Sequence, residues 1–268
     1  MSRVKIGIIG CLGRMGKALT AVVLDHDNAE LIGATEAVGN EFIGTLIIHP
    51  LTGVQSNIII TTDTDELIKN ADVVLDFTCP TATVGHAMIA SKTETSLIVG
   101  TTGLSTADED VLREAAKSTS IVYASNYSTG VNLMFHLTKI AATVLDEDFD
   151  IEIVEMHHRD KVDAPSGTAL SIGKSAAAGR DKGLDEIKES GRDGISEPRK
   201  RGDIGFASLR GGNVSGEHTV SFNADDERIE ITHKAGDRAI FAKGALRAAL
   251  WIKGQKNGLY DISDVLGL

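Results

Sequence analysis

The sequence has 268 residues, of which 42% are hydrophobic and 24% are charged. At about 150 residues per domain, this length suggests one large or two modest domains, and the composition excludes a disordered chain. With 27 basic and 38 acidic residues, the formal charge is -11. This argues against a general nucleic-acid binder, because such proteins neutralise phosphates with cations. A local basic pocket for a small anion is compatible with this charge.

The cysteine count and the apolar runs indicate the compartment. Two cysteines, Cys11 and Cys79, exclude a disulfide framework and a cysteine-rich zinc site, and they fit a reduced cytoplasmic setting. The apolar run before Gly10 is too short for a signal peptide, and no run approaches the roughly 18 residues of a membrane-spanning helix. We therefore expect a cytoplasmic protein without a membrane partner.

The first half of the chain alternates short apolar runs with helical segments. Strands are expected at Val4–Ile9, Ala29–Thr35, Asn57–Thr61, Val73–Phe77, Ser96–Val99 and Ile121–Ala124. Helices are expected at Gly13–Leu24, after a cap at Asp63 or Thr64, from Pro80 to about Ser91, and at Thr106–Ser118. This alternation is typical of right-handed βαβ units. It predicts an α/β fold with a Rossmann-like doubly wound parallel sheet over about residues 1–127.

The pattern changes after residue 127. We expect a helix at Val131–Leu145, a strand at Ile151–Met156, a helix at Gly167–Ala178 and a long loop at Gly179–Gly202. Strand-like runs at Ile204–Leu209, Glu217–Phe222 and Arg228–His233 suggest an antiparallel sheet with one covered face. We expect a second, α+β domain over about residues 128–238. The segment 239–268, which begins with a helix at Ala239–Ile252, is expected to return to the first domain.

A glycine-rich turn follows the first strand. Gly10, Gly13 and Gly16 have the spacing Gly-x-x-Gly-x-x-Gly, and Leu12 stands where the usual dinucleotide motif has its second glycine. Glu36 ends the second strand about 20 residues later, where a carboxylate can bind ribose hydroxyls. Glycines let the backbone approach a pyrophosphate, and the helix N-terminus attracts negative charge. We expect dinucleotide binding; a tight turn without a ligand is the alternative.

The preference between NADH and NADPH depends on the residues around Glu36. A carboxylate favours the ribose diol and repels a 2′-phosphate, and Ala37 offers no cation, although Arg14 could. We expect NADH to be preferred, with some use of NADPH. The turns Gly100–Gly103 and Ser125–Ser128 follow later strands, where ligands of open α/β sheets bind. They either line the nicotinamide end of the groove or are ordinary turns, and Phe77-Thr78 has the same two interpretations.

The segment from Glu155 to Thr168 carries the most chemistry. His157, His158, Arg159 and Lys161 form a basic cluster in an acidic chain, which suits an anionic substrate. A lysine near other cations is a candidate proton donor. Pro165 sets the backbone before Ser166-Gly167-Thr168 begins a helix, whose amides could bind a carboxylate.

Two other interpretations of this segment are a metal site and a basic loop without function. Adjacent residues on a strand point to opposite faces, so His157 and His158 would not easily share a metal ion, and we expect no metal. A solvated basic loop without function is the second alternative.

The segment Glu155-Met156-His157-His158 through Lys161-Val162-Asp163-Ala164-Pro165-Ser166-Gly167-Thr168-Ala169 resembles the signature of the dihydrodipicolinate reductase family. Further matches occur in the family's order at Gly10 to Gly16, Asp76-Phe77-Thr78, Gly100-Thr101-Thr102-Gly103 and Gly216-Glu217-His218-Thr219. The resemblance covers essentially the whole chain. It implies a 4-hydroxy-tetrahydrodipicolinate reductase of lysine and diaminopimelate biosynthesis, which transfers a hydride from NAD(P)H to a cyclic imine dicarboxylate.

The resemblance also implies residue roles. His157 and Lys161 are the acid–base pair, and His158, Gly167 and Thr168 bind the substrate carboxylates. The implied cofactor contacts are Gly10, Cys11, Leu12, Gly13, Arg14, Met15, Glu36, Gly100, Thr101, Thr102, Ala124, Ser125, Asn126 and Tyr127. Many members have arginine where this chain has Ala37, a departure that supports NADH. The family implies a homotetramer formed through the sheet of the second domain.

Two rival functions make different demands on the sequence. Another two-domain NAD(P)-dependent dehydrogenase, acting on an aldehyde, would need a nucleophilic cysteine, and neither Cys11 nor Cys79 lies near His157 in the sequence. A non-catalytic nucleotide sensor would need the glycine turn but not the basic cluster. Domain closure over the substrate is also expected, with hinges near Asn126–Gly130 and Arg238.

Overall fold

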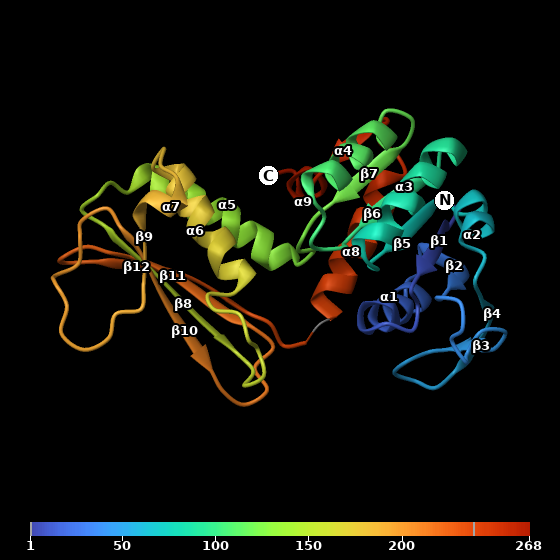
Figure 1. Ribbon diagram of the computed structural model, residues 1–268, viewed down its shortest axis with the longest axis horizontal. Coiled ribbons are helices and arrows are strands. Elements are labelled where there is room, and N and C mark those ends of the chain that lie inside the picture. Colours follow the sequence, from blue (N-terminus) through green and yellow to red (C-terminus); the bar gives the residue numbers. More distant parts are fainter. Residues whose placement is uncertain (1, 238) are drawn as a thin grey trace. The chain divides into compact units, whose positions relative to one another are not determined.

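A computed structural model describes residues 2–237 and 239–268 (Figure 1). The chain folds as two compact units. One unit comprises the residues up to Thr129 together with Ala239–Leu268, and the other begins at Gly130 and occupies the segment between them. Of the two expected hinge segments, Arg238 lies outside the described residues.

The first unit is built on an eight-stranded sheet in the order β13-β7-β6-β5-β1-β2-β4-β3. All neighbouring pairs are parallel except β3 with β4. The strands are β1 (Val4–Ile9), β2 (Ala29–Thr35), β3 (Leu46–Ile48), β4 (Gln55–Thr61), β5 (Val73–Asp76), β6 (Ser96–Val99), β7 (Ser120–Tyr123) and β13 (Gly258–Tyr260). Because β2 and β5 flank β1 on its two sides, the strand order reverses at β1. The predicted doubly wound α/β fold is confirmed.

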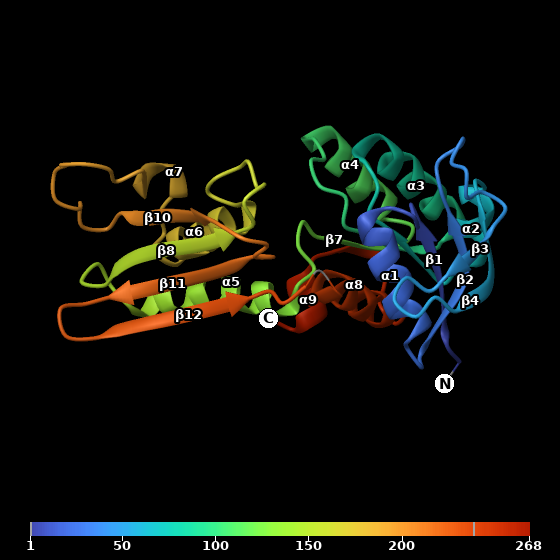
Figure 2. The same cartoon turned by 90° about the horizontal axis from the view of Figure 1, so that it is seen from below.

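Helices cover both faces of this sheet, as Figures 1 and 2 show. The helices are α1 (Arg14–Leu24), α2 (Thr64–Asn70), α3 (Pro80–Thr93), α4 (Thr106–Ala115), α8 (Ala239–Ile252) and α9 (Ile262–Leu266). Side chains of α1, α8 and α9 pack with Ile6 and Ile8 of β1 in one core. Side chains of α2, α3 and α4 pack with Ile9 and Val74 in a second core on the other face. Successive side chains of a strand point to opposite faces of the sheet, so the strands contribute side chains to both cores.

The second unit has a five-stranded sheet in the order β12-β11-β8-β10-β9, seen in Figure 2 with α5 and α6 behind it. Its elements are α5 (Thr129–Val144), β8 (Asp150–His157), α6 (Gly167–Gly179), α7 (Leu184–Ile187), β9 (Lys188–Ser190), β10 (Ile204–Arg210), β11 (Glu217–Asn223) and β12 (Arg228–Lys234). The sheet is mixed rather than antiparallel, because β10 runs parallel to both β8 and β9. The long connection from β8 through α6 provides the crossover that a parallel neighbour needs.

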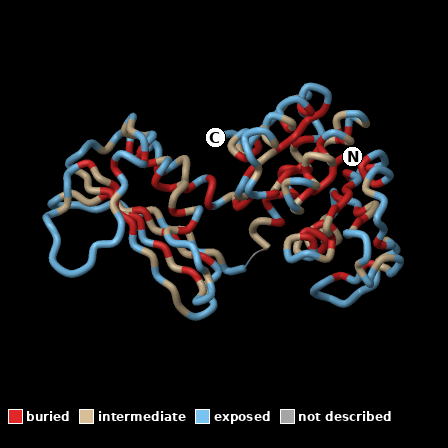
Figure 3. The backbone as a smooth tube through the Cα atoms, viewed as in Figure 1, coloured by how far each residue is buried: buried red, intermediate tan, exposed pale blue. Residues whose placement is uncertain are grey.

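One face of this second sheet is covered and the other is exposed. Ile151, Ile153, Val220 and Phe222 point to the covered face and are fully buried against α5, α6 and α7. Val154 and Leu209 point to the opposite face, where 40% and 51% of their surface is exposed. Figure 3 shows the buried residues concentrated between the helices and the sheets.

Several short elements differ from the expectations. The segment 179–202 is not wholly irregular, because α7 and β9 lie within it, and β3, β13 and α9 were not expected. These elements are three to five residues long, too short for a periodic pattern to develop. None of the helices in the described part of the chain is long and apolar enough to cross a membrane.

Candidate functional site

The glycine turn is shaped by backbone contacts that leave no room for side chains. Gly10 has a φ of 71°, and its amide and that of Cys11 both donate to the carbonyl of Thr35. A Cβ on Gly16 would lie 2.0 Å from the Gly10 carbonyl oxygen. Both positions therefore require glycine, Gly10 for its left-handed backbone and Gly16 for the close approach of α1 to β1.

Helix α1 starts directly from this turn with an open N-terminus. Gly13 occupies the N-cap position and has no side chain to accept from the first amides. The first turn of α1 contains no acidic residue. The positive end of the helix dipole is therefore uncompensated there, which favours an anion such as a pyrophosphate. The turn and the helix start fit a dinucleotide, with Arg14 and Met15 as the first two helical residues.

Glu36 is held against the turn at the end of β2. Its Oε2 accepts from the Leu12 amide at 3.0 Å, and its Oε1 accepts from the Ala37 amide at 2.9 Å. The carboxylate is thus fixed beside the phosphate cradle, and each oxygen has a further lone pair for a hydroxyl. Ala37 is exposed and brings no charge.

A buried polar network joins the ends of β5 and β6. Asp76 is fully buried and accepts from Nδ1 of His86 at 2.8 Å and from the Thr78 hydroxyl at 2.6 Å. The Thr78 amide donates to Oγ1 of Thr101, which also bonds to the Thr83 hydroxyl at 2.7 Å. The network fixes the buried Thr101 at the carboxyl edge of the sheet, beside the exposed Thr102.

Aromatic packing continues this edge towards β7. The Phe77 ring lies on the backbone of Gly100, where an added Cβ would be 2.0 Å from a ring carbon. Phe77 also contacts the ring of Tyr127, with centroids 5.3 Å apart. Tyr127 is buried, and its hydroxyl lies within hydrogen-bonding distance of the Val99 and Val122 carbonyls. Its side chain is thus part of the core, so a ligand at this edge would meet other parts of the 124–127 turn, such as the exposed Ser125.

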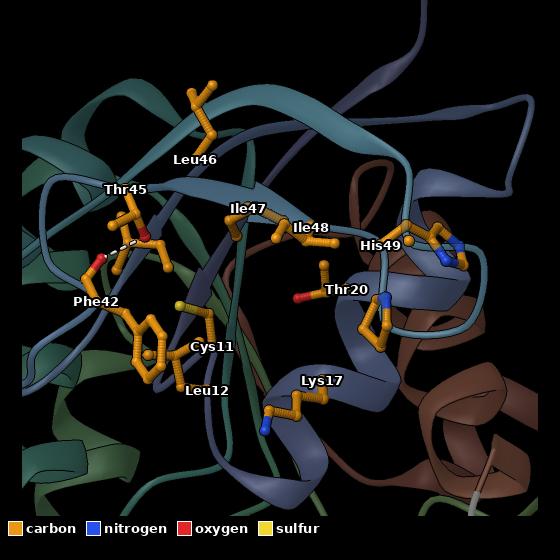
Figure 4. A pocket seen from close by; sticks show the side chains of 13 residues that line it. Cys11, Leu12, Lys17, Thr20, Phe42, Thr45, Leu46, Ile47, Ile48 and His49 are labelled. Atoms are coloured by element: carbon orange, nitrogen blue, oxygen red, sulfur yellow. Dashed lines mark hydrogen bonds between the residues drawn. The ribbon is translucent and has the colours of Figure 1, made fainter.

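A pocket of about 380 Å³ opens beside the glycine turn (Figure 4). Its walls come from the turn, α1 and the segment 42–53, and include Leu12, Lys17, Thr20 and Phe42. Most of the lining side chains are apolar. The pocket borders the nucleotide turn, and its lining contains none of the candidate reaction residues from 157 to 168.

Cys11, which also lines this pocket, does not suit a nucleophile. Burial, with the nearby Glu36 carboxylate adding to it, raises the pKa of the Cys11 thiol to about 11. The thiol therefore stays protonated at neutral pH, and the thiolate is the reactive form. This weighs against the rival aldehyde chemistry at Cys11.

In the second unit, the covered face of the sheet changes from apolar to ionisable at one end. Along β8, Ile151 and Ile153 are followed in the same phase by Glu155 and His157, all buried. On β11, His218 is in phase with Val220 and Phe222, and it pairs with Glu155 and with His233 of β12. On β10, Arg210 is the register partner of His157. These five residues, Glu155, His157, Arg210, His218 and His233, are called the polar layer below.

Glu155 is the centre of the polar layer. It is 1% exposed and forms a two-pronged ion pair with Arg210, at 2.8 and 2.9 Å. Its carboxylate also accepts from Nδ1 of His157 at 2.6 Å and from the Ser166 amide at 3.2 Å. Burial raises the pKa of Glu155, but hydrogen bonds from Arg210, His157 and Ser208 outweigh it and lower the pKa to about 2. The buried carboxylate is therefore ionised and fully partnered.

Ser166 connects the polar layer to the start of α6. Its hydroxyl accepts from the Ala169 amide at 3.2 Å, which makes Ser166 the N-cap, and lies 3.0 Å from Nε2 of His218. Burial, reinforced by the nearby His157, lowers the pKa of His218 to about 4. Gly167 is exposed and Thr168 half-buried at the first turn of α6.

Lys161 lies on the loop between β8 and α6. Its Nζ contacts both carboxylate oxygens of Asp163, at 2.7 and 2.9 Å, and its side chain is 20% exposed. The Lys161 amide donates to the carbonyl of His158, which is half-buried just past the end of β8. His157 is buried and His158 is not, and among the described residues no group of three or more His, Cys, Asp or Glu could hold a metal ion.

The comparisons with known proteins cover both units. A family model described as dihydrodipicolinate reductase, N-terminus, matches residues 4–127, and one for the C-terminus matches residues 130–266. The chain belongs to the dihydrodipicolinate reductase family. It is 49% identical over 263 residues to the 4-hydroxy-tetrahydrodipicolinate reductase of Ruegeria sp. (strain TM1040), covering 98% of each chain. It is 50% identical over 272 residues to that of Rhodopseudomonas palustris (strain TIE-1), covering 100% of this chain and 99% of the other.

The fold of this family is also seen in a solved structure. A dipicolinate-bound dihydrodipicolinate reductase from Paenisporosarcina sp. TG-14 superposes with a TM-score of 0.78 over 97% of each chain, at 22% identity. The predicted membership of the dihydrodipicolinate reductase family is thus confirmed, and the first unit is its Rossmann nucleotide-binding domain.

Sequence reasoning missed several residues that organise the site. The sequence pattern gave no role to Arg210, His218 or His86, which bind Glu155, Ser166 and Asp76, respectively. The signal for Glu155 and His157 was their phase, because they follow Ile151 and Ile153 on the buried side of one strand. Nothing in the sequence indicated the partner of Asp76, because strand β5 and helix α3 carry the two residues separately.

Proposed function

We propose that this protein is a 4-hydroxy-tetrahydrodipicolinate reductase that acts in lysine and diaminopimelate biosynthesis. The supporting observation is that the family models for the N-terminal and C-terminal parts of one reductase match residues 4–127 and 130–266. The chain also contains both the glycine cradle and the His157–Thr168 segment. The proposed substrate is a cyclic imine dicarboxylate that takes up a hydride and a proton. Aldehyde chemistry at Cys11 is not supported, because Cys11 is buried and its raised pKa keeps the thiol protonated at neutral pH.

In this proposal the first unit binds the dinucleotide. The bound reduced nicotinamide supplies the hydride. The amides at Gly13, Arg14 and Met15 would face the pyrophosphate, with Gly10, Cys11 and Leu12 forming the turn, and Glu36 would accept from the ribose hydroxyls. Contacts near the nicotinamide would come from Gly100, Thr101, Thr102 and the turn Ala124, Ser125, Asn126 and Tyr127.

The second unit would hold the substrate and supply the proton. His158 and the backbone at Gly167 and Thr168 would bind the carboxylates, because a helix N-terminus presents amides to an anion. His157 and Lys161 would form the acid–base pair, with the ammonium of Lys161 as the proton donor. One general acid contributes about 10²–10⁴-fold, or roughly 3–5 kcal/mol, whereas alignment of the reactants can contribute about 7–11 kcal/mol. Positioning should therefore be the larger effect.

The reaction and the cofactor preference can be tested in one assay. The protein is coupled to dihydrodipicolinate synthase, which generates the substrate, and absorbance at the nicotinamide band is followed with NADH and NADPH separately. We expect oxidation of both cofactors, with the higher kcat/KM for NADH because Glu36 would repel a 2′-phosphate and Ala37 offers no cation. Absence of oxidation with either cofactor would reject the reductase, and a strong NADPH preference would reject only the NADH assignment.

We further propose that four copies assemble through the exposed face of the second sheet. Val154, Ala207 and Leu209 are exposed on this face, where Val154 and Ala207 are register partners. Light scattering should give about four times the 28.3 kDa chain mass. Leu209→Asp should lower the measured mass, because it introduces a charge on that face. Val38→Asp, at an 89% exposed position of the first unit, should leave the mass unchanged. A monomer for the unmodified protein would contradict the proposal.

A further inference from the structure

The loop that carries Lys161 is attached to the sheet through one arginine. Arg210, the last residue of β10, donates to the carbonyl of Lys161 at 3.2 Å and to the carbonyl of Asp163 at 2.6 Å. The same guanidinium forms the two-pronged pair with Glu155. One side chain thus connects the strand that bears His157 to the loop that bears Lys161.

Glu155 links the same arginine to His157 and to the start of α6. Because its carboxylate can only accept, the short contact to His157 places a proton on Nδ1 and turns Nε2 away from the carboxylate. The Ser166 amide binds the other carboxylate oxygen and so ties in the start of α6. The buried carboxylate of Glu155 therefore contacts His157 and the start of α6 directly, and it is connected to the Lys161 loop through Arg210.

The chemistry of the pair explains why arginine is required. A planar guanidinium has five donors in a fixed fork, so it can bind both oxygens of a carboxylate and still reach two carbonyls. Lysine would keep the charge but present a single point donor. Loss of Arg210 would leave the buried carboxylate of Glu155 without its main partner and the two loop carbonyls without a donor.

We propose that Arg210 and Glu155 are positioning residues of the reductase reaction, which hold the Lys161 loop in a fixed relation to His157 and the start of α6. This inference rests on the proposed function for its catalytic consequence. Its structural part, the attachment of the 158–165 loop by Arg210, can be measured without any activity.

The test compares Arg210→Gln with Arg199→Gln by hydrogen–deuterium exchange and by steady-state kinetics. Arg199 is a matched control, because its side chain is 17% exposed and bridges Asp150, Glu152 and the Ile151 carbonyl near the other end of β8. In Arg210→Gln we expect faster exchange in 158–165 and a fall in kcat of up to about 100-fold, as for small misplacements of catalytic groups. Cofactor binding, followed by NADH fluorescence, should be unchanged, and Arg199→Gln should keep the loop exchange and kcat of the unmodified protein.

A double variant separates positioning from general stabilisation. If Arg210 acts through Lys161, then adding Arg210→Gln to Lys161→Ala should lower kcat by less than about threefold, because residues of one unit are non-additive. If Arg210→Gln does not fold, Arg210→Lys keeps the charge beside Glu155 and should still release the loop.

The outcomes distinguish the two proposals. Unchanged exchange in 158–165 for Arg210→Gln, or a full additional fall in kcat in the double variant, would overturn the positioning role. An unmodified protein without reductase activity would reject the proposed function, while the exchange data would still decide whether Arg210 holds the loop.

Discussion

Replacing Lys161 with alanine is expected to lower kcat by about 10²–10⁴-fold and to leave cofactor binding intact. The reason is that the proposed proton donor is lost, while every residue of the glycine cradle belongs to the other unit. Asp163 anchors the ammonium of Lys161, with its two carboxylate oxygens at 2.7 and 2.9 Å from Nζ.

The measurement combines the coupled assay with an NADH titration. Lys182→Ala is the matched control, because Lys182 in the same unit also forms a lysine–carboxylate pair, with Glu147 at 2.6 Å. It should retain the kcat of the unmodified protein. A near-normal kcat in Lys161→Ala would remove Lys161 from the mechanism and leave the proton to another donor.

Acid is expected to destabilise the second unit in two successive windows, through His218 and then Glu155. The pKa of buried His218 is lowered to about 4 from 6.5, so the unfolded chain binds a proton that the folded chain does not, and stability falls as the pH drops from 6.5 to 4. The pKa of Glu155 is lowered to about 2 from 4.5, so its contribution is present above pH 4.5 and is lost between 4.5 and 2. The His218 shift corresponds to on the order of 3 kcal/mol.

Urea unfolding at pH 7 and pH 5, at one protein concentration, tests the first window. The unmodified protein should lose on the order of 2 kcal/mol of unfolding free energy between these values through His218. His218→Gln should remove this part of the loss of unfolding free energy between pH 7 and pH 5, whatever the stability of the variant at pH 7. His136→Gln, which changes a histidine of the same unit outside the polar layer, should keep it. An identical slope in His218→Gln and in the unmodified protein would show that His218 does not carry the effect.

The parts of the fold that sequence could predict were the apolar runs and helical patterns that alternate along the chain. β2, β6 and α8 have the expected bounds, and the glycine turn was located by its position between a strand and a helix. The direction of β10 was not predictable, because alternation of side chains is the same in parallel and antiparallel strands. Direction depends on which strand becomes the neighbour, and the approximately 50-residue separation of β8 and β10 hides that choice.

Sequence patterns predict which types of residue the candidate site contains, but they do not predict which of these residues contact one another. The segment from His157 to Thr168 predicts an anion-binding site, whereas the contacts of Glu155 come from β10 and the start of α6 and have no signal in that segment. Asp76 and His86 lie ten positions apart and meet only because α3 packs back on the sheet. Such pairs depend on tertiary packing, which a local pattern does not encode.

The last segment of the chain has a consequence for folding during synthesis. Helix α8 supplies Ala242, Ala245 and Ala249 to the core beside α1, and a Cβ on Gly244 would lie 1.7 Å from the Tyr127 carbonyl oxygen. The core of the nucleotide-binding unit is therefore incomplete until residues 239–268 have been synthesised, which follows the synthesis of the whole inserted unit. A nascent chain would therefore expose apolar surface of the first unit while the inserted unit is translated. Such exposed apolar surface is bound by chaperones.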